Sequence, residues 1–177
     1  MNIFILNTGR CGSTTFIKAC QHIMNYSASH ESRSTLIGAQ RLAYADNHIE
    51  ADNRLSWLLG RLDRKYANNA FYVHLQRDIN KTTNSFAKRS DFGIMLAYKE
   101  GILLGGDNAQ SSHDIAMDYV DTVEANIALF LKDKTNVMNF QLENARQDFK
   151  SFWNTITAVG DLDKALREWD TAHNASL

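Results

Sequence analysis

The feature that most constrains the fold is an abrupt change of pattern in the first twenty residues, MNIFILNTGRCGSTTFIKAC. An apolar run stops at a turn that contains Gly9 and Gly12, and apolar residues at helical spacing resume at Phe16. This pattern predicts a buried strand at 2–7, a tight turn and a helix at 13–25. Such a turn directs backbone N–H groups and a helix N-terminus toward one point, which is typical of a phosphate site. A plain glycine turn before a capped helix is the alternative.

Strand patterns and helical patterns alternate along the rest of the chain. Further strands are expected at 26–30, 70–75 and 137–140. Helices are expected at 34–46, 51–67, 79–89, 112–132, 145–158 and 162–172, and the ambiguous segment 93–104 is compatible with another. The alternation predicts an α/β fold, a single domain over residues 1–177 with three layers and a mostly parallel sheet. Ligands of such sheets bind at the carboxyl ends of the strands.

Composition excludes several classes of protein. The chain has 177 residues, 44% of them hydrophobic, which is enough for one buried core. Its net charge of −1 gives no overall field that favours nucleic acid or a membrane surface. No apolar run approaches the ~18 residues of a membrane span. The N-terminus resembles a core strand rather than a signal peptide, and Cys11 and Cys20 are expected to be reduced thiols. We therefore expect a cytoplasmic protein without nucleic-acid or membrane partners.

A second group of anion-binding side chains follows the strand at 70–75. Arg77 comes directly after it, and Ser85 and Arg89 are four residues apart on one face of the next helix. Each arginine can bind a phosphate in bidentate geometry. Taken alone, this segment is equally compatible with an amphipathic helix whose basic face is solvated. Together with Arg10 in the first turn, it predicts a ligand with two separated anionic groups, such as a 3′,5′-bisphosphorylated nucleoside.

These residues resemble the motifs of the sulfotransferase superfamily, P-loop-like α/β enzymes that take a sulfuryl group from 3′-phosphoadenosine 5′-phosphosulfate (PAPS). Residues 8–14, TGRCGST, are similar to the family's 5′-phosphosulfate loop, and the spacing of Arg77-Asp78, Ser85 and Arg89 matches its 3′-phosphate motif R-D-x6-S-x3-R. The resemblance implies a donor site with PAPS as donor and 3′-phosphoadenosine 5′-phosphate (PAP) as product, and without a metal. Its residues would be Gly9, Arg10, Cys11, Gly12, Ser13, Thr14, Thr15, Arg77, Ser85 and Arg89.

The catalytic residues implied by the resemblance lie after the second strand. The sequence His30-Glu31-Ser32-Arg33 is similar to an acidic element of bacterial and tyrosylprotein members, in which the glutamate is the proposed base. Glu31 would be the base, Arg33 would orient it or hold the sulfuryl group, and Arg10 would bind the bridging and sulfuryl oxygens. His30 is the alternative base. Side chains alternate along a strand, so we expect only one of His30 and Glu31 to face the site, and favour Glu31.

The end of the chain carries a weaker resemblance. Residues 137–143 are similar to a late strand of the family, and Trp169 and His173-Asn174 to its closing pattern. The acceptor is expected to be a hydroxyl of a small molecule, a carbohydrate or a peptide, and no motif identifies which. Two other functions stay open. One is a P-loop nucleotide kinase or triphosphatase, disfavoured because the lysine of G-x-x-x-x-G-K-[ST] is missing. The other is a non-catalytic module that binds a nucleotide.

Overall fold

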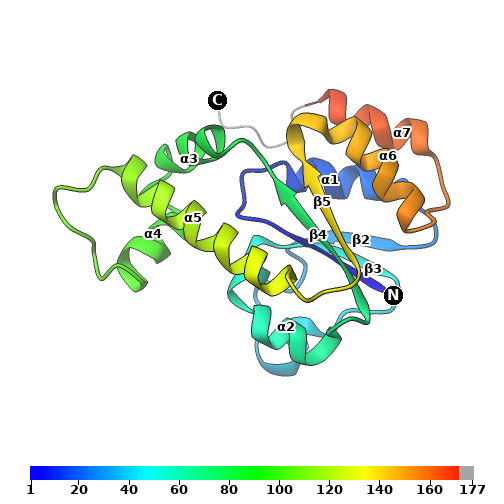
Figure 1. Cartoon of the computed structure of the whole chain (residues 1–177), viewed down its shortest axis with the longest axis horizontal. Helices are drawn as coiled ribbons and strands as arrows, with labels where there is room; N and C mark the ends of the chain where they lie inside the picture. The colour runs from blue at the N-terminus through cyan, green and yellow to red at the C-terminus, as the bar shows by residue number, and fades with distance from the viewer. Residues whose placement is uncertain (172–177) are drawn as a thin grey trace.

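The structure is a computed structural model that describes residues 1–171. Its centre is a sheet of parallel strands in the order β2-β3-β1-β4-β5 (Figure 1). The strands are β1 (Asn2–Leu6), β2 (Ser27–His30), β3 (His48–Ala51), β4 (Ala70–Gln76) and β5 (Val137–Gln141). Since β1 lies between β3 and β4, the chain runs from β1 to one side of the sheet and later returns to the other. The loop after β1 therefore occupies the switch point, where α/β sheets bind ligands.

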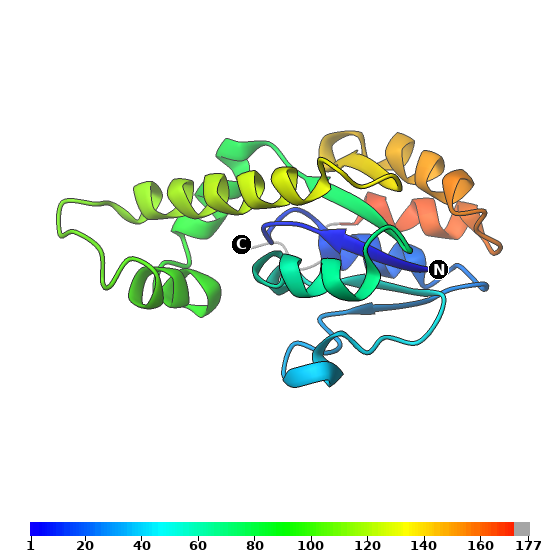
Figure 2. The same cartoon turned by 60° about the horizontal axis from the view of Figure 1, so that its bottom comes forward.

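Helices cover both faces of this sheet (Figures 1 and 2). The helices are α1 (Ser13–Cys20), α2 (Leu59–Tyr66), α3 (Ile79–Ala87), α4 (Gly93–Gly101), α5 (Ser112–Leu131), α6 (Ala145–Thr155) and α7 (Leu162–Arg167). Alternate side chains of β1 point to opposite faces, as in any strand. Ile3 and Ile5 pack with α1, α6 and α7, whereas Phe4 and Leu6 pack with α2 and α5. The predicted three-layer α/β fold is confirmed, and the sheet is parallel throughout.

The segment between β2 and α2 differs from the prediction. The helix expected at 34–46 is only a 3₁₀ turn, Gly38–Leu42, and the one expected at 51–67 is a 3₁₀ turn, Asn53–Trp57, followed by α2. Between them lies β3, which the sequence did not predict. Its sequence, HIEA, carries two residues that usually prefer water, yet all four residues are buried. Hydrogen bonds to the side chains of His48 and Glu50 offset the cost of burying them, as described below.

Several element ends also differ. Helix α1 ends at Cys20 rather than residue 25, because the chain turns there into an isolated bridge between Ile23 and Gly160. The last helix ends at Arg167 and continues as the 3₁₀ turn Glu168–Asp170. His173 and Asn174 lie outside the described residues. In residues 1–171, no helix has the length and hydrophobicity that crossing a membrane requires.

Candidate active site

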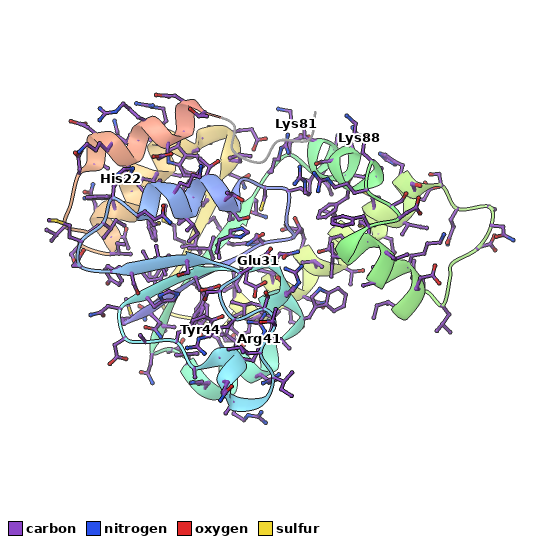
Figure 3. All side chains as sticks on the ribbon, turned by 180° about the vertical axis from the view of Figure 1, so that it is seen from behind. His22, Glu31, Arg41, Tyr44, Lys81 and Lys88 are labelled. Carbon is purple, nitrogen blue, oxygen red and sulfur yellow. The ribbon has the colours of Figure 1, made fainter. Side chains whose placement is uncertain are left out.

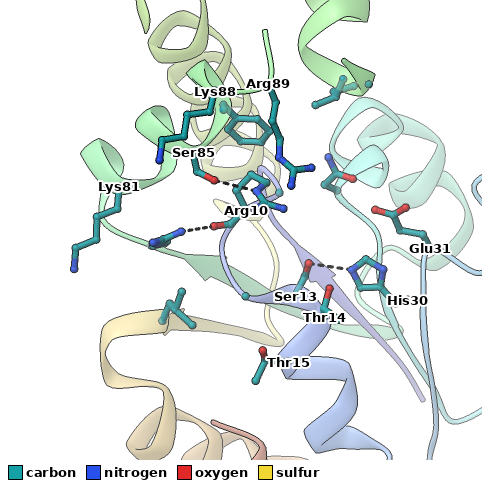
Figure 4. Close-up of a pocket in the computed structure, with 18 of the residues that line it drawn as sticks. Arg10, Ser13, Thr14, Thr15, His30, Glu31, Lys81, Ser85, Lys88 and Arg89 are labelled. Atoms are coloured by element: carbon teal, nitrogen blue, oxygen red, sulfur yellow. Dashed lines mark hydrogen bonds between the residues drawn. The ribbon is translucent and has the colours of Figure 1, made fainter. Parts of the chain in front are cut away.

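A cavity of about 890 Å³ lies at the carboxyl ends of the strands (Figure 4). Its walls are the loop after β1, the ends of β2 and β3, helix α3 and the start of α4. Among its described lining residues, six are basic and two are acidic. The basic ones are Arg10, Arg54, Arg77, Lys81, Lys88 and Arg89, and the acidic ones are Glu31 and Asp170. This excess of positive charge favours an anionic ligand.

The loop after β1 has a backbone that only a few residue types adopt readily. Gly9, Arg10 and Gly12 have φ values of 91°, 60° and 88°. A Cβ at Gly12 would lie 2.6 Å from Leu142 Cδ1, so this position leaves no room for a side chain as the structure stands. The left-handed Arg10 costs about 1–3 kcal/mol, which surrounding contacts must offset. Consecutive residues of this kind turn N–H groups toward one concave point, which suits an anion.

Neighbouring elements hold this loop in place. The Asn7 side chain accepts a hydrogen bond from Gly9 N over 2.9 Å, and the Tyr119 hydroxyl of α5 donates to Thr8 O over 2.7 Å. Gly12 is the N-cap of α1, so this helix has no side-chain cap. The Ser13 hydroxyl instead contacts His30 Nε2 over 3.0 Å. Ser13, together with the hydroxyl residues Thr14 and Thr15, lines the cavity at the start of α1.

Arg10 connects the two predicted anion-binding motifs. Its Nε donates a hydrogen bond to Ser85 Oγ on α3 over 3.0 Å, and its carbonyl accepts one from Arg77 Nη1 over 2.9 Å. Burial lowers the pKa of Arg10, and the nearby guanidiniums of Arg89 and Arg77 lower it further. Figure 4 shows Arg10, Ser85 and Arg89 gathered at one end of the cavity. A bound anion would relieve the repulsion among the three arginines.

Helix α3 contributes more to the cavity than its motif residues. Asp78 caps the helix by accepting a hydrogen bond from Lys81 N over 2.9 Å, so it has a structural role. Ser85 lies within α3, and Arg89 follows its C-terminal end. Lys81 and Lys88 also line the cavity, which the sequence analysis missed. Their spacing from Ser85, four residues before and three after, places them on its helical face and could have revealed them.

The structure corrects the expectation that only one of His30 and Glu31 faces the site. Both line the cavity. His30 is the last residue of β2, and Glu31 has a φ of 52°, so the strand alternation ends between them. Glu31 forms an ion pair with Arg54 over 2.9 Å, whereas His30 contacts Ser13. The left-handed turn at Glu31 thus brings a carboxylate and an imidazole to the same space.

Arg33 does not reach the cavity, contrary to its predicted role beside Glu31. Its Nη1 donates to the carbonyl of Gln40 over 2.8 Å, and its guanidinium lies 5.5 Å from the centre of the Tyr44 ring. Arg54, from the 3₁₀ turn after β3, takes the predicted place of Arg33 at Glu31. The helix predicted at 51–67 would have contained Arg54. The structure has β3 and a 3₁₀ turn there instead, and the end of β3 brings Arg54 to this edge of the sheet.

Cys11 lies behind the loop rather than in the cavity. Its side chain is buried and burial raises the pKa of its thiol to about 12, so the thiol stays protonated at neutral pH. Cys11 and Cys20 are both free cysteines.

Trp169 also lines the cavity. It lies on the face of the sheet that α1 covers, where its ring centre is 6.0 Å from that of Phe16. Within the described part of the chain, no three His, Cys, Asp or Glu residues are placed to hold a metal ion.

Comparisons with known proteins agree with this architecture. No protein-family model matches the chain, and no curated protein sequence matches it significantly. Among solved structures, the sulfotransferase domain from the curacin biosynthetic pathway is 14% identical, with a TM-score of 0.62 over 93% of this chain and 75% of that one. The mouse sulfotransferase SULT7A1 complexed with PAP is 12% identical, with a TM-score of 0.56 over 96% of this chain. The chain spans 63% of the length of that mouse enzyme. The protein therefore has the fold of sulfotransferase domains.

Proposed function

We propose that the protein transfers a sulfuryl group from PAPS to a hydroxyl acceptor. One observation carries this proposal: the loop after β1 and the Arg77, Ser85 and Arg89 group line one cavity, joined by the contact between Arg10 and Ser85. Two separate anion sites suit a donor that carries a 3′-phosphate as well as a 5′-phosphosulfate. The sulfotransferase fold and the PAP complex of one structural neighbour support the same donor.

The donor would lie across the loop and α3. Backbone N–H groups of residues 9–15 and the start of α1 would bind the 5′-phosphate. Ser85, Arg89 and Arg77 would bind the 3′-phosphate through charge-assisted hydrogen bonds. Arg10 lies between these two groups, where its positive charge can stabilise the bridging oxygen as negative charge develops there during transfer.

The acceptor would enter from the end of the cavity that Glu31 lines. Trp57, at the end of the 3₁₀ turn that carries Arg54, packs on Tyr98 of α4 with ring centres 6.2 Å apart. Residues 92–95, at the start of α4, also line the cavity. Glu31 would take the proton of the acceptor hydroxyl as the sulfuryl group is transferred. As in phosphoryl transfer, positioning and electrostatic stabilisation would supply most of the rate enhancement.

Calorimetry with three nucleotides tests the donor assignment. PAP should bind more tightly than 5′-AMP by about ten- to a hundredfold, because losing a charge-assisted contact costs roughly 1.5–3 kcal/mol. PAP without magnesium should also raise the melting temperature more than ATP with magnesium. Equal affinity for PAP and AMP would contradict the 3′-phosphate site. Stabilisation only by ATP with magnesium would indicate a kinase or triphosphatase instead.

A further inference from the structure

The structure contains a buried carboxylate next to the candidate active site. Glu50, on β3, has no exposed surface. Its Oε1 accepts a hydrogen bond from Ser32 N over 2.7 Å, and its Oε2 accepts one from Ser32 Oγ over 2.6 Å. His48 Nε2 lies 3.0 Å from the same Oε2. A buried carboxylate is costly unless such partners satisfy it, so its presence at this place calls for an explanation.

The two hydrogen bonds to Ser32 hold the chain directly after Glu31. The Glu31 N–H donates to Ala51 O over 3.0 Å, so the chain is attached to β3 both at Glu31 and at the next residue. Between these two attachments Glu31 adopts its φ of 52°. This conformation is disfavoured for residues other than glycine, asparagine and aspartate, so the attachments must maintain it. It is also the conformation that directs the Glu31 carboxylate into the cavity beside His30.

His48 in turn fixes Glu50. Its other ring nitrogen, Nδ1, lies 2.7 Å from Ser27 Oγ, and its ring stacks on that of Tyr44 with centres 5.4 Å apart. In Figure 3, Glu31 lies between Tyr44 on one side and, on the other, Lys81 of α3 and Lys88, which directly follows α3. The network thus supports the Glu31 turn from the side away from the donor site.

We propose that Glu50 is a positioning residue, which holds the Glu31–Ser32 turn so that Glu31 can act as the base. This inference rests on the proposed function for the role of Glu31, but the positioning itself is a property of the turn. Glu50 touches neither donor nor acceptor in this arrangement, because it is not among the residues that line the cavity. Its loss should therefore reduce turnover and leave nucleotide binding intact.

The comparison of Glu50→Ala with Glu50→Gln tests this role. Glu50→Ala removes both acceptors of Ser32 and should lower kcat by about 10- to 100-fold, as expected when a reacting group is displaced by about 1 Å. KM for PAPS and the affinity for PAP should stay within about twofold. Glu50→Gln should keep most of the wild-type kcat. The oxygen of the glutamine can accept from Ser32 N, and its NH₂ group can donate to Ser32 Oγ and to Nε2 of a neutral His48. Equal kcat in wild type and Glu50→Ala would overturn the proposal, as would a parallel loss of PAP affinity.

A crystal structure of Glu50→Ala decides the positioning independently of any activity. The proposal expects Glu31 to leave the left-handed region and to lose its contact with Arg54. An unchanged Glu31 turn would overturn it, even if the protein proves to be a sulfotransferase. Conversely, a wild type that transfers to no acceptor would contradict the proposed function alone. If Glu50→Ala does not fold, Ser32→Ala on the exposed turn should still lower kcat with PAP affinity unchanged, and full turnover in that variant would count against positioning.

Discussion

Arg10 Nε donates a hydrogen bond to Ser85 Oγ over 3.0 Å, and this contact joins segments that are 75 residues apart in the sequence. It places the loop after β1 against α3. Arg77 strengthens the connection by donating to the Arg10 carbonyl. The two motifs found in the sequence are therefore walls of one site, and substitutions in each should affect different parts of the same ligand.

Arg89→Ala should separate the two anion sites. We expect it to weaken PAP binding by about ten- to a hundredfold, because one charge-assisted contact to the 3′-phosphate is lost. Binding of 5′-AMP should hardly change, since AMP has no 3′-phosphate. Calorimetry with both nucleotides measures the difference, and Arg64→Ala, on the exposed face of α2, is the matched control. Equal losses for PAP and AMP would mean that Arg89 does not distinguish the two phosphates.

Replacing Arg10 by glycine and by alanine should reveal the strain in the loop. Both substitutions remove the guanidinium, but only alanine keeps a Cβ at a φ of 60°. The left-handed conformation costs such residues roughly 1–2 kcal/mol, partly offset by the greater flexibility of glycine in the unfolded chain. We expect Arg10→Gly to be more stable than Arg10→Ala by about 1 kcal/mol in urea unfolding. A less stable glycine variant would show that the loop relaxes when the side chain is removed.

Glu31→Gln and His30→Ala should identify the base. Glu31→Gln keeps the shape of the side chain and removes its basicity, so turnover should fall by roughly 10²–10⁴-fold while PAP affinity is retained. His30→Ala should have a much smaller effect, because His30 is engaged by Ser13. Steady-state kinetics with a working acceptor provide the comparison. Near-normal turnover of Glu31→Gln beside an inactive, folded His30→Ala protein would assign the role to His30.

The buried thiol of Cys11 should make stability depend on alkaline pH. Burial raises its pKa from the ordinary 9.0 to about 12, so the folded state keeps the proton that the unfolded state loses. Its stabilising contribution is complete below pH 9 and should decline between pH 9 and 12, by about 1.4 kcal/mol per pH unit. Cys11→Ala should show a shallower decline in urea unfolding between pH 9 and 10. The same slope in both proteins would exclude this effect.

Of the strands that the structure describes, the sequence predicted β1, β2, β4 and β5 but not β3. β1 and β4 are the clearest cases, because each is an apolar run that gives way to polar residues, Asn7-Thr8 after β1 and Gln76-Arg77 at the end of β4. β3 was not predicted because its polar side chains, Glu50 and His48, are satisfied by hydrogen bonds with Ser32 and Ser27, which are distant in sequence. Periodicity alone cannot show that a buried glutamate is satisfied. With β3 missed, the adjoining segments were assigned to helices.

The candidate site was also predicted in part. Apart from Cys11, the residues predicted for the loop after β1 line one cavity together with Arg77, Ser85 and Arg89. Arg33 was the wrong partner for Glu31, because neighbours in sequence need not be neighbours around a left-handed turn. Arg54 could be recognised only after the end of β3 was known. The resemblance in sequence thus predicted the cavity lining at the loop after β1 and at α3 better than the surroundings of Glu31.

Transfer of a radiolabelled sulfuryl group from PAPS to pooled hydroxyl acceptors tests the proposed activity most directly. Phenols, aliphatic alcohols, sugars and tyrosine peptides would be presented to the wild type and to Glu31→Gln. We expect the wild type to label at least one acceptor pool, with PAP formed in equal amount, and Glu31→Gln to bind PAP but label that pool at least about a hundredfold more slowly. A wild type that binds PAP and labels no pool would contradict the activity and indicate a nucleotide-binding module.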